Sequence, residues 1–266
     1  MKSRRITPLS VVWSCLPLAL AMILATPTAS FALGDWIGVE GSMWRQSQDG
    51  TASIDGDILG GTTIDFQDTL GLDKDDDTLM GRVWFRFGRT HINLDYFDSE
   101  RDGDTILTQS FAFNDTVYTA GQAMSSDLKL KLYQAHFLFS IINLKVVDFG
   151  LGFGANQADV DMSLDGSVSG LTTLQESVPY PTLAGYVTIK PAPAFHIKVE
   201  VNGVKGDMSG THVDVLDGRA QMELYVAHAL GFFAGYRQFH FEVEDEGFGS
   251  IDNTFKGPYA GIGLKF

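Results

Sequence analysis

The sequence predicts an all-β fold: an antiparallel barrel that crosses a membrane on ten strands. Apolar and polar residues alternate with a period of two through most of the chain. The predicted strands are joined alternately by short and by long connections, as in membrane barrels. After the N-terminal segment, no apolar run is long enough for a membrane helix. Eight or twelve strands remain alternatives, because strand ends read from alternation shift by a few residues.

The N-terminal segment, residues 1–32, is expected to be a secretory signal peptide. It starts with basic residues, continues with the apolar run LPLALAMILA, and ends with Ser30 and Ala32 at the two positions that a signal peptidase reads. The barrel domain would then span 33–266, and a retained anchor is the alternative. The only cysteine, Cys15, lies inside the segment, so the mature chain would have no disulfide.

The mature chain would be strongly acidic. The whole chain has 19 Lys and Arg residues and 33 Asp and Glu residues, and residues 1–32 hold three basic and no acidic ones. The remaining 16 basic and 33 acidic residues give a net charge of −17. This balance disfavours nucleic acid as a partner, and it disfavours direct contact with lipid phosphates unless metal ions mediate it.

Ten segments alternate like a half-exposed strand. In 78–88, for example, Leu79 and Phe85 alternate with Arg82 and Arg86. The segments are 35–44, 78–88, 91–97, 131–139, 146–156, 180–190, 195–201, 219–230, 232–243 and 257–266. Short connections are expected near 89–90, 143, 191–194 and 231, and long ones over 46–77, 100–126, 161–174, 206–215 and 244–253.

The two faces of these segments differ in kind. One face is rich in Phe, Val, Ile and Leu, and we expect it to face lipid. A soluble lipocalin-like barrel, with the apolar face inward, is the alternative, and the export signal and the unequal connections disfavour it. The other face would line the lumen with a polar network of Glu40, Arg82, Arg86, His91, Asp95, His136, Asp148, His196, Lys198 and Glu200.

The chain ends in GPYAGIGLKF, which places Phe266, Leu264, Ile262 and Ala260 on one face and Tyr259 on the other. This ending resembles the closing strand of bacterial outer-membrane β-barrel proteins, and the stretch GTTIDFQDTLGL resembles little-characterised small barrels of that class. The resemblance covers the mature chain at the level of pattern. It implies an outer-membrane location, a surround of membrane lipid and lipopolysaccharide, and recognition of the last strand by the outer-membrane assembly machinery.

The sequence favours a non-enzymatic role. Barrel proteases and lipid-modifying barrels need a nucleophile with a base, or paired carboxylates with a His-Asp couple, and no histidine here has such partners in register. His136 and Ser140 share a face, but Ser140 is expected at a turn, and His212 and Asp214 are expected on a loop. No catalytic residue is therefore assigned, and a barrel protease or lipid-modifying enzyme remains the minor alternative.

The size of the barrel bears on conduction. Ten strands enclose a narrow lumen, in which opposite charges pair and block passage. We therefore expect a structural or surface-interaction protein with a largely plugged polar lumen and an extracellular ligand that the sequence does not identify. A narrow, porin-like solute channel is the alternative.

An acidic stretch, LDKDDDT, is the remaining local signal. It places Asp73, Asp75 and Asp77 at alternate positions, the spacing at the start of a calcium-binding loop. The glycine and the final glutamate of that loop are missing, since Thr78 and Trp84 occupy their positions. The stretch is interpreted as a solvated acidic rim, with a Ca²⁺ site as the alternative, and no other cofactor is expected.

Overall fold

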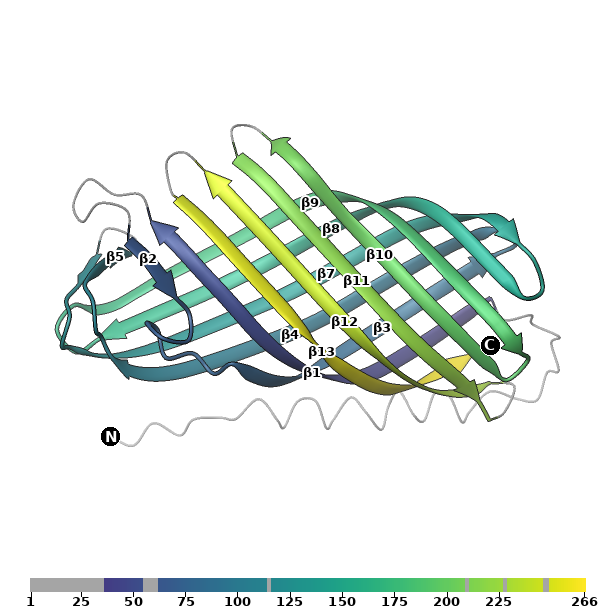
Figure 1. Cartoon of the computed structure of the whole chain (residues 1–266), viewed down its shortest axis with the longest axis horizontal. Helices are drawn as coiled ribbons and strands as arrows, with labels where there is room; N and C mark the ends of the chain where they lie inside the picture. Colours follow the sequence, from purple (N-terminus) through teal and green to yellow (C-terminus); the bar gives the residue numbers. More distant parts are fainter. Residues whose placement is uncertain (1–35, 55–61, 114–115, 209–210, 227–228, 246–248) are drawn as a thin grey trace, which may run out of the picture. The chain divides into compact units, whose positions relative to one another are not determined.

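The computed structural model describes residues 36–54, 62–113, 116–208, 211–226, 229–245 and 249–266 (Figure 1). The predicted signal peptide and its cleavage site lie outside these residues. Within them, no helix is long and apolar enough to span a membrane.

Ten antiparallel strands form a closed barrel, which confirms the predicted fold class. Each strand pairs with its neighbours in chain order, and β13 pairs with β1 to close the sheet (Figure 1). Closure leaves no open sheet edge facing lipid, where a backbone amide would find no partner. The barrel strands are β1 (Ile37–Ile54), β3 (Asp75–Phe87), β4 (Thr90–Ile106), β7 (Ala123–Asn143), β8 (Val147–Gly166), β9 (Gly170–Ala192), β10 (Phe195–Met208), β11 (Thr211–Tyr225), β12 (Leu230–Asp245) and β13 (Gly249–Lys265).

Short turns join the strands at one end of the barrel, called here the short-turn end. Gly88 there has a φ of 61°, a conformation that favours glycine, and the chain reverses at once from β3 into β4. Pro193 and Ala194 make the turn between β9 and β10, as predicted. The predicted turn at Gly231 is misplaced, because Gly231 lies inside β12 and the chain reverses before it.

The predicted long connections are wrong in extent. β1 continues to Ile54, β4 to Ile106, and only residues 167–169 separate β8 from β9. The predicted loops over 206–215 and 244–253 are likewise mostly strand. The strands thus extend well past the segments that the sequence indicates, toward the end of the barrel opposite the short turns, called here the far end.

Three short strands complete the far end. β2 (Thr62–Asp65) pairs with the last residues of β1, and β5 (Phe111–Phe113) pairs with β6 (Thr116–Tyr118) in a separate two-stranded sheet. Ile64 of β2, Phe111 and Phe113 of β5, and Tyr118 of β6 are all buried. These elements therefore contribute apolar side chains to the core of the far half.

The outer surface is richest in apolar residues in the half next to the short turns. On β8, Leu151 and Phe153 are exposed there, whereas Asp165 occupies the same face at the far end. The rings of Tyr96 and Tyr133 contact each other on the outside, with 5.0 Å between centroids, near the upper limit of this belt. Aromatic residues at the edge of an apolar band mark the membrane interface. Beyond it the wall is polar, as in the exposed Lys129–Glu100 ion pair of 2.6 Å.

The interior has the opposite arrangement, with apolar residues in the far half. Inward positions of the far half form one buried cluster: Ile64, Phe66, Leu70, Leu72, Leu107, Phe111, Phe113, Tyr118, Met124, Leu128 and Leu164. A second buried cluster lies below it: Trp44, Met80, Phe97, Leu130, Leu132, Tyr180, Val213, Val215, Phe233, Phe239, Phe255 and Tyr259. The strands outside the bilayer thus enclose an apolar core like that of a soluble barrel.

The C-terminal segment closes the barrel. Leu264 pairs with Val39 of β1, and the amide of Phe266 donates to the carbonyl of Ile37 over 2.8 Å. The carbonyl of Phe266 accepts from the amide of Trp36 over 3.0 Å. The last residue therefore completes the seam between the first and the last strand.

Deleting Phe266 should lower the yield of folded barrel in the outer membrane, because it removes the three backbone hydrogen bonds that Phe266 makes across the seam, together with its aromatic ring. The measurement is the amount of heat-modifiable, folded band in the outer-membrane fraction. Phe266→Tyr, which keeps the backbone and the ring, is the control and should assemble normally. A normal yield from the deleted chain would contradict this role of the last residue.

An arginine should be costly inside the apolar belt and tolerated above it. Leu183 and Leu171 both face outward on β9, with exposed fractions of 77% and 66%, but Leu171 lies next to the far-end turn. Leu183→Arg should lower the free energy of unfolding by about 2–4 kcal/mol, the cost of arginine near the bilayer midplane. Leu171→Arg, the matched control, should change it little. Equilibrium unfolding in lipid vesicles measures both, and equal costs would disprove the position of the belt.

Candidate functional site in the barrel interior

The polar network predicted for the lumen does point inward. Arg82, Asp95, His136, Asp148 and Glu200 are buried. The remaining residues of the network line a cavity near the short-turn end, and Asp148 and Glu200 line it too. These remaining residues are Glu40, Arg86, His91, His196 and Lys198. The network therefore divides into a solvent-accessible cavity and a buried part above it.

Arg82 is the centre of the buried part. Its guanidinium binds Asp95 through two hydrogen bonds, from Nε over 2.7 Å and from Nη2 over 3.1 Å. Nη1 donates to Glu200 on the opposite wall over 2.8 Å. Arg219 of β11 binds the same two carboxylates, and Lys198 approaches Glu200 within 3.1 Å. These charges from β3, β4, β10 and β11 link the two sides of the lumen, and bidentate pairing fixes their geometry.

A second arginine lies above this layer. Arg237, of which only 2% is exposed, donates to both oxygens of Asp217, over 3.0 Å from Nε and 2.7 Å from Nη2. Its guanidinium also stacks on the rings of Trp44 and Phe97, at 5.2 and 4.9 Å from the centroids. Cation–π contact lets this charged group lie at the boundary between the polar layer and the apolar core.

The sequence-based assignment missed Asp217 and Arg219 and left Arg237 out of the network. Asp217, Arg219 and Glu223 alternate on the inner face of β11. That alternation was visible in the sequence, but residues 206–215 looked like a loop, which hid the start of the strand.

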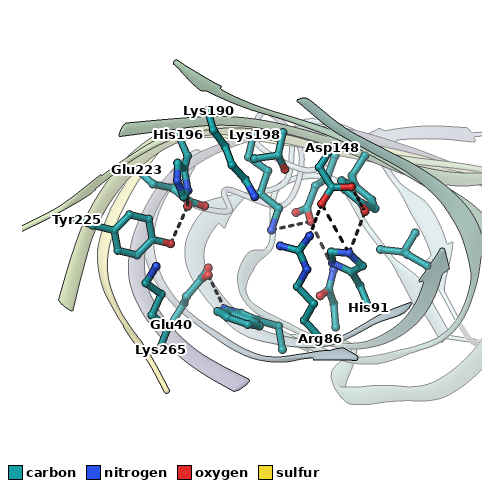
Figure 2. Close-up of a pocket in the computed structure, with 16 residues that line it drawn as sticks. Glu40, Arg86, His91, Asp148, Lys190, His196, Lys198, Glu223, Tyr225 and Lys265 are labelled. Atoms are coloured by element: carbon teal, nitrogen blue, oxygen red, sulfur yellow. Dashed lines mark hydrogen bonds and ion pairs between the residues drawn. The ribbon is translucent and has the colours of Figure 1, made fainter. Parts of the chain in front are cut away.

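The cavity at the short-turn end has a volume of about 110 Å³ (Figure 2). Side chains from most of the wall converge on it, and acids, bases and aromatic rings all contribute. Its lining residues are Glu40, Trp84, Arg86, His91, Asn93, Leu138, Asp148, Tyr186, Thr188, Lys190, His196, Lys198, Glu200, Glu223, Tyr225 and Lys265.

One side of the cavity holds a hydroxyl-rich cluster. His91 Nε2 lies 3.0 Å from Ser140 Oγ and 3.0 Å from the hydroxyl of Tyr186, and that hydroxyl donates to Asp148 over 2.9 Å. Ser140 lies inside β7, not at a turn as expected, and its contacts are with His91 and Tyr186 rather than His136. The expectation that Ser140 lies at a turn is therefore wrong.

This cluster lacks the geometry of a catalytic triad. A triad places the serine and the carboxylate on different nitrogens of the histidine. Here Asp148 lies 3.8 Å from the same Nε2 that faces Ser140, and Ser140 is fully buried. The arrangement suits a structural hydrogen-bond network better than nucleophilic attack.

Three of the four aspartates of the acidic stretch lie outside the lumen. Asp73, Asp75 and Asp77 are exposed, whereas Asp76 points inward and accepts a hydrogen bond of 2.7 Å from Thr78. In the described part of the chain, no group of three or more His, Cys, Asp or Glu side chains is arranged to hold a metal ion. The Ca²⁺ site at these residues stays a prediction.

A basic residue of the same stretch makes an ion-pair cluster at the far half of the wall. Asp49 lies between Lys74, 2.7 Å away, and Lys256, 2.8 Å away. Hydrogen bonds from Lys256 and Lys74 lower the pKa of the Asp49 carboxyl. This cluster ties β1, β13 and the residue before β3 together.

The structure is similar to solved outer-membrane barrels, while no protein-family model and no curated protein sequence matches the chain. The outer membrane protease OmpT from Escherichia coli is similar with a TM-score of 0.57 at 10% identity, over 90% of this chain and 100% of that one. The transport unit of the autotransporter AIDA-I from Escherichia coli gives a TM-score of 0.42 at 9% identity, over 95% of this chain and 97% of that one. At sequence identities this low, the similarity concerns the fold alone. The chain has the fold of a bacterial outer-membrane β-barrel protein, and its apolar belt fits it to that membrane.

Proposed function

We propose that this protein is a non-enzymatic outer-membrane barrel with a structural or surface-interaction role and a closed lumen. The observation that carries the proposal is the stacking of interior layers. Paired arginines and carboxylates cross the lumen at Arg82, Arg237 continues the polar layer, and two apolar clusters occupy the interior, one of them in the far half. A solute would have to displace all of them.

The energetics of these layers favour closure. Separating Arg82 from Asp95 and Glu200 would leave buried charges without partners, which typically costs about 3–5 kcal/mol. Opening the far half would also expose Trp44, Phe97 and Phe111 to water, at about 25 cal/mol for each Å² of apolar surface. The plug differs from the expected polar one, because its far half is apolar.

The outer wall above the belt supports a role at the cell surface. Several exposed acidic residues of β4, β7 and β8 face outward there: Asp98, Glu100, Asp102, Asp104, Asp127 and Asp165. Lys129 shares this wall and pairs with Glu100. Membrane lipid and lipopolysaccharide would cover the belt below, the assembly machinery would read the closing strand, and this acidic surface would remain free for an extracellular ligand.

Because the structure is similar to that of OmpT, a protease is the alternative function to compare with the non-enzymatic proposal. Such an enzyme needs an acidic pair and a His-Asp couple that face each other. The candidates here are Asp75 with Asp77 on β3, and His212 with Asp214 on β11. All four sit at outward-facing strand positions, and Asp214 pairs with Lys205 at 2.5 Å. These residues cannot meet across the lumen, so the geometry disfavours that chemistry.

The purified protein should give no steady conductance in planar bilayers, because charged and apolar layers both close its lumen. Recordings at several voltages, with a known porin as the positive control, measure this directly. A large and steady current from the unmodified protein would overturn the closed-barrel proposal and favour the narrow-channel alternative.

Replacing Arg82 should destabilise the barrel far more than replacing an exposed partner of an ion pair. Arg82→Met leaves Asp95 and Glu200 with one cation fewer, and we expect a loss of about 3–5 kcal/mol in the free energy of unfolding. Lys129→Met, which breaks only an exposed pair with Glu100, should cost about 0–1 kcal/mol. Urea unfolding in vesicles measures both, and similar values would show that Arg82 does not hold the lumen together.

A further inference from the structure

We propose that the cavity at the short-turn end binds a small zwitterion that carries an ammonium and a carboxylate group, of the size of glycine or alanine. In an outer-membrane barrel the short turns face the periplasm, so the ligand would enter from that side. The site does not require conduction, since the layer at Arg82 closes the cavity above.

The cavity is accessible to solvent and suitably small. The exposed fractions of the Arg86, Lys198 and His196 side chains are 27%, 19% and 15%, so water reaches the lining. A cavity of about 150 Å³ can hold benzene, so the 110 Å³ found here fits a somewhat smaller molecule. Larger ligands could bind only if they extended toward the opening.

Glu40 provides the site for the ammonium group. The other lumen acids, Asp95, Asp148, Glu200, Asp217 and Glu223, each have a Lys, Arg or His nitrogen within 4.0 Å. In the described part of the chain Glu40 has none, and its carboxylate accepts one hydrogen bond, of 3.1 Å, from the indole of Trp84. A secluded carboxylate without a direct ion-pair partner is unfavourable, so a cationic group would be attracted to it.

Trp84 holds Glu40 in place. Gly38 of β1 pairs with Trp84 of β3, and a Cβ atom added at Gly38 would lie 2.3 Å from the indole ring. The glycine therefore leaves the space in which the ring packs against the wall, with its N–H directed at Glu40. The face of such a ring also favours a nearby cation.

Arg86 provides the site for the carboxylate group. Its Nη2 donates to Asp148 over 2.8 Å, and this is the one side-chain hydrogen bond that the described residues give it. A guanidinium has five N–H donors in a planar fork, so most of them remain for a ligand. Figure 2 shows Arg86 directed into the cavity, with His91 and Lys198 beside it. A carboxylate is the group that such a fork binds best.

Glu40 and Arg86, called here the two anchors, explain why a zwitterion should bind better than a singly charged molecule. Glu40 and Arg86 reach the same cavity from the neighbouring strands β1 and β3 (Figure 2). The lining also has as many Asp and Glu as Lys and Arg residues, so a neutral molecule keeps it balanced whereas an isolated ion does not.

Calorimetric titration of the purified barrel in detergent tests the proposal with three probes: alanine, methylamine and acetate. Alanine should bind at least about tenfold more tightly than either singly charged probe, because only it engages both anchors. This comparison uses the unmodified protein and does not depend on any variant. Absence of alanine binding, or equal binding of acetate or methylamine, would overturn the proposal.

Two variants assign the anchors. Glu40→Gln should weaken alanine binding at least about tenfold and leave acetate binding unchanged, and Arg86→Gln should weaken alanine equally and leave methylamine unchanged. Glu100→Gln and Arg89→Gln, at exposed positions outside the cavity, are the matched controls and should bind alanine normally. Heat-modifiable mobility on gels verifies that each variant is folded. Normal alanine binding by folded Glu40→Gln or Arg86→Gln would refute the assigned anchor.

Discussion

Each long strand of this barrel has to satisfy two solvents, because lipid surrounds one half and water the other. The side-chain period of a strand is fixed at two, so the backbone cannot rotate to suit the change. The sequence changes instead. On β8, Leu151 and Phe153 face outward near the short turns, whereas Val160 and Leu164 face inward at the far end. The apolar residues thus move from the odd to the even positions along a single strand.

This reversal determines what can fill the lumen. Where the apolar residues face lipid, the inner face carries charged residues, and a ten-stranded barrel brings these charges within pairing distance across the lumen. Arg82 and Glu200 are 118 positions apart in the chain and nonetheless lie 2.8 Å apart. Where water surrounds the wall, the inner face is apolar and packs like the interior of a soluble protein, with Phe111 and Tyr118 from the β5–β6 hairpin inside. Closure of the lumen follows from both halves together.

The arginines lie at the boundary between the charged part and the apolar part of the lumen. Arg82 and Arg219 share Asp95 and Glu200, and Arg237 binds Asp217 while it stacks on Trp44 and Phe97. Planar guanidinium groups suit this boundary, since their edges bind carboxylates and their faces contact aromatic rings. Below the boundary lies the cavity, where Glu40 has no ion-pair partner among the described residues and Arg86 pairs with Asp148 alone. The proposed ligand site and the proposed plug can therefore coexist in one lumen.

The sequence by itself determined the fold class, the strand count of ten and the inward direction of the polar network, because these follow from a period of two, while the closing strand was indicated by its resemblance to that of bacterial outer-membrane barrels. It did not reveal how far the strands extend, because the reversal of alternation beyond the belt looked like loop. Nor could it show that Arg82 meets Glu200, that Ser140 contacts His91, or that Arg237 stacks on Trp44. Those contacts join residues far apart in the chain, and only closure of the barrel, with its register, decides which side chains face each other across the lumen.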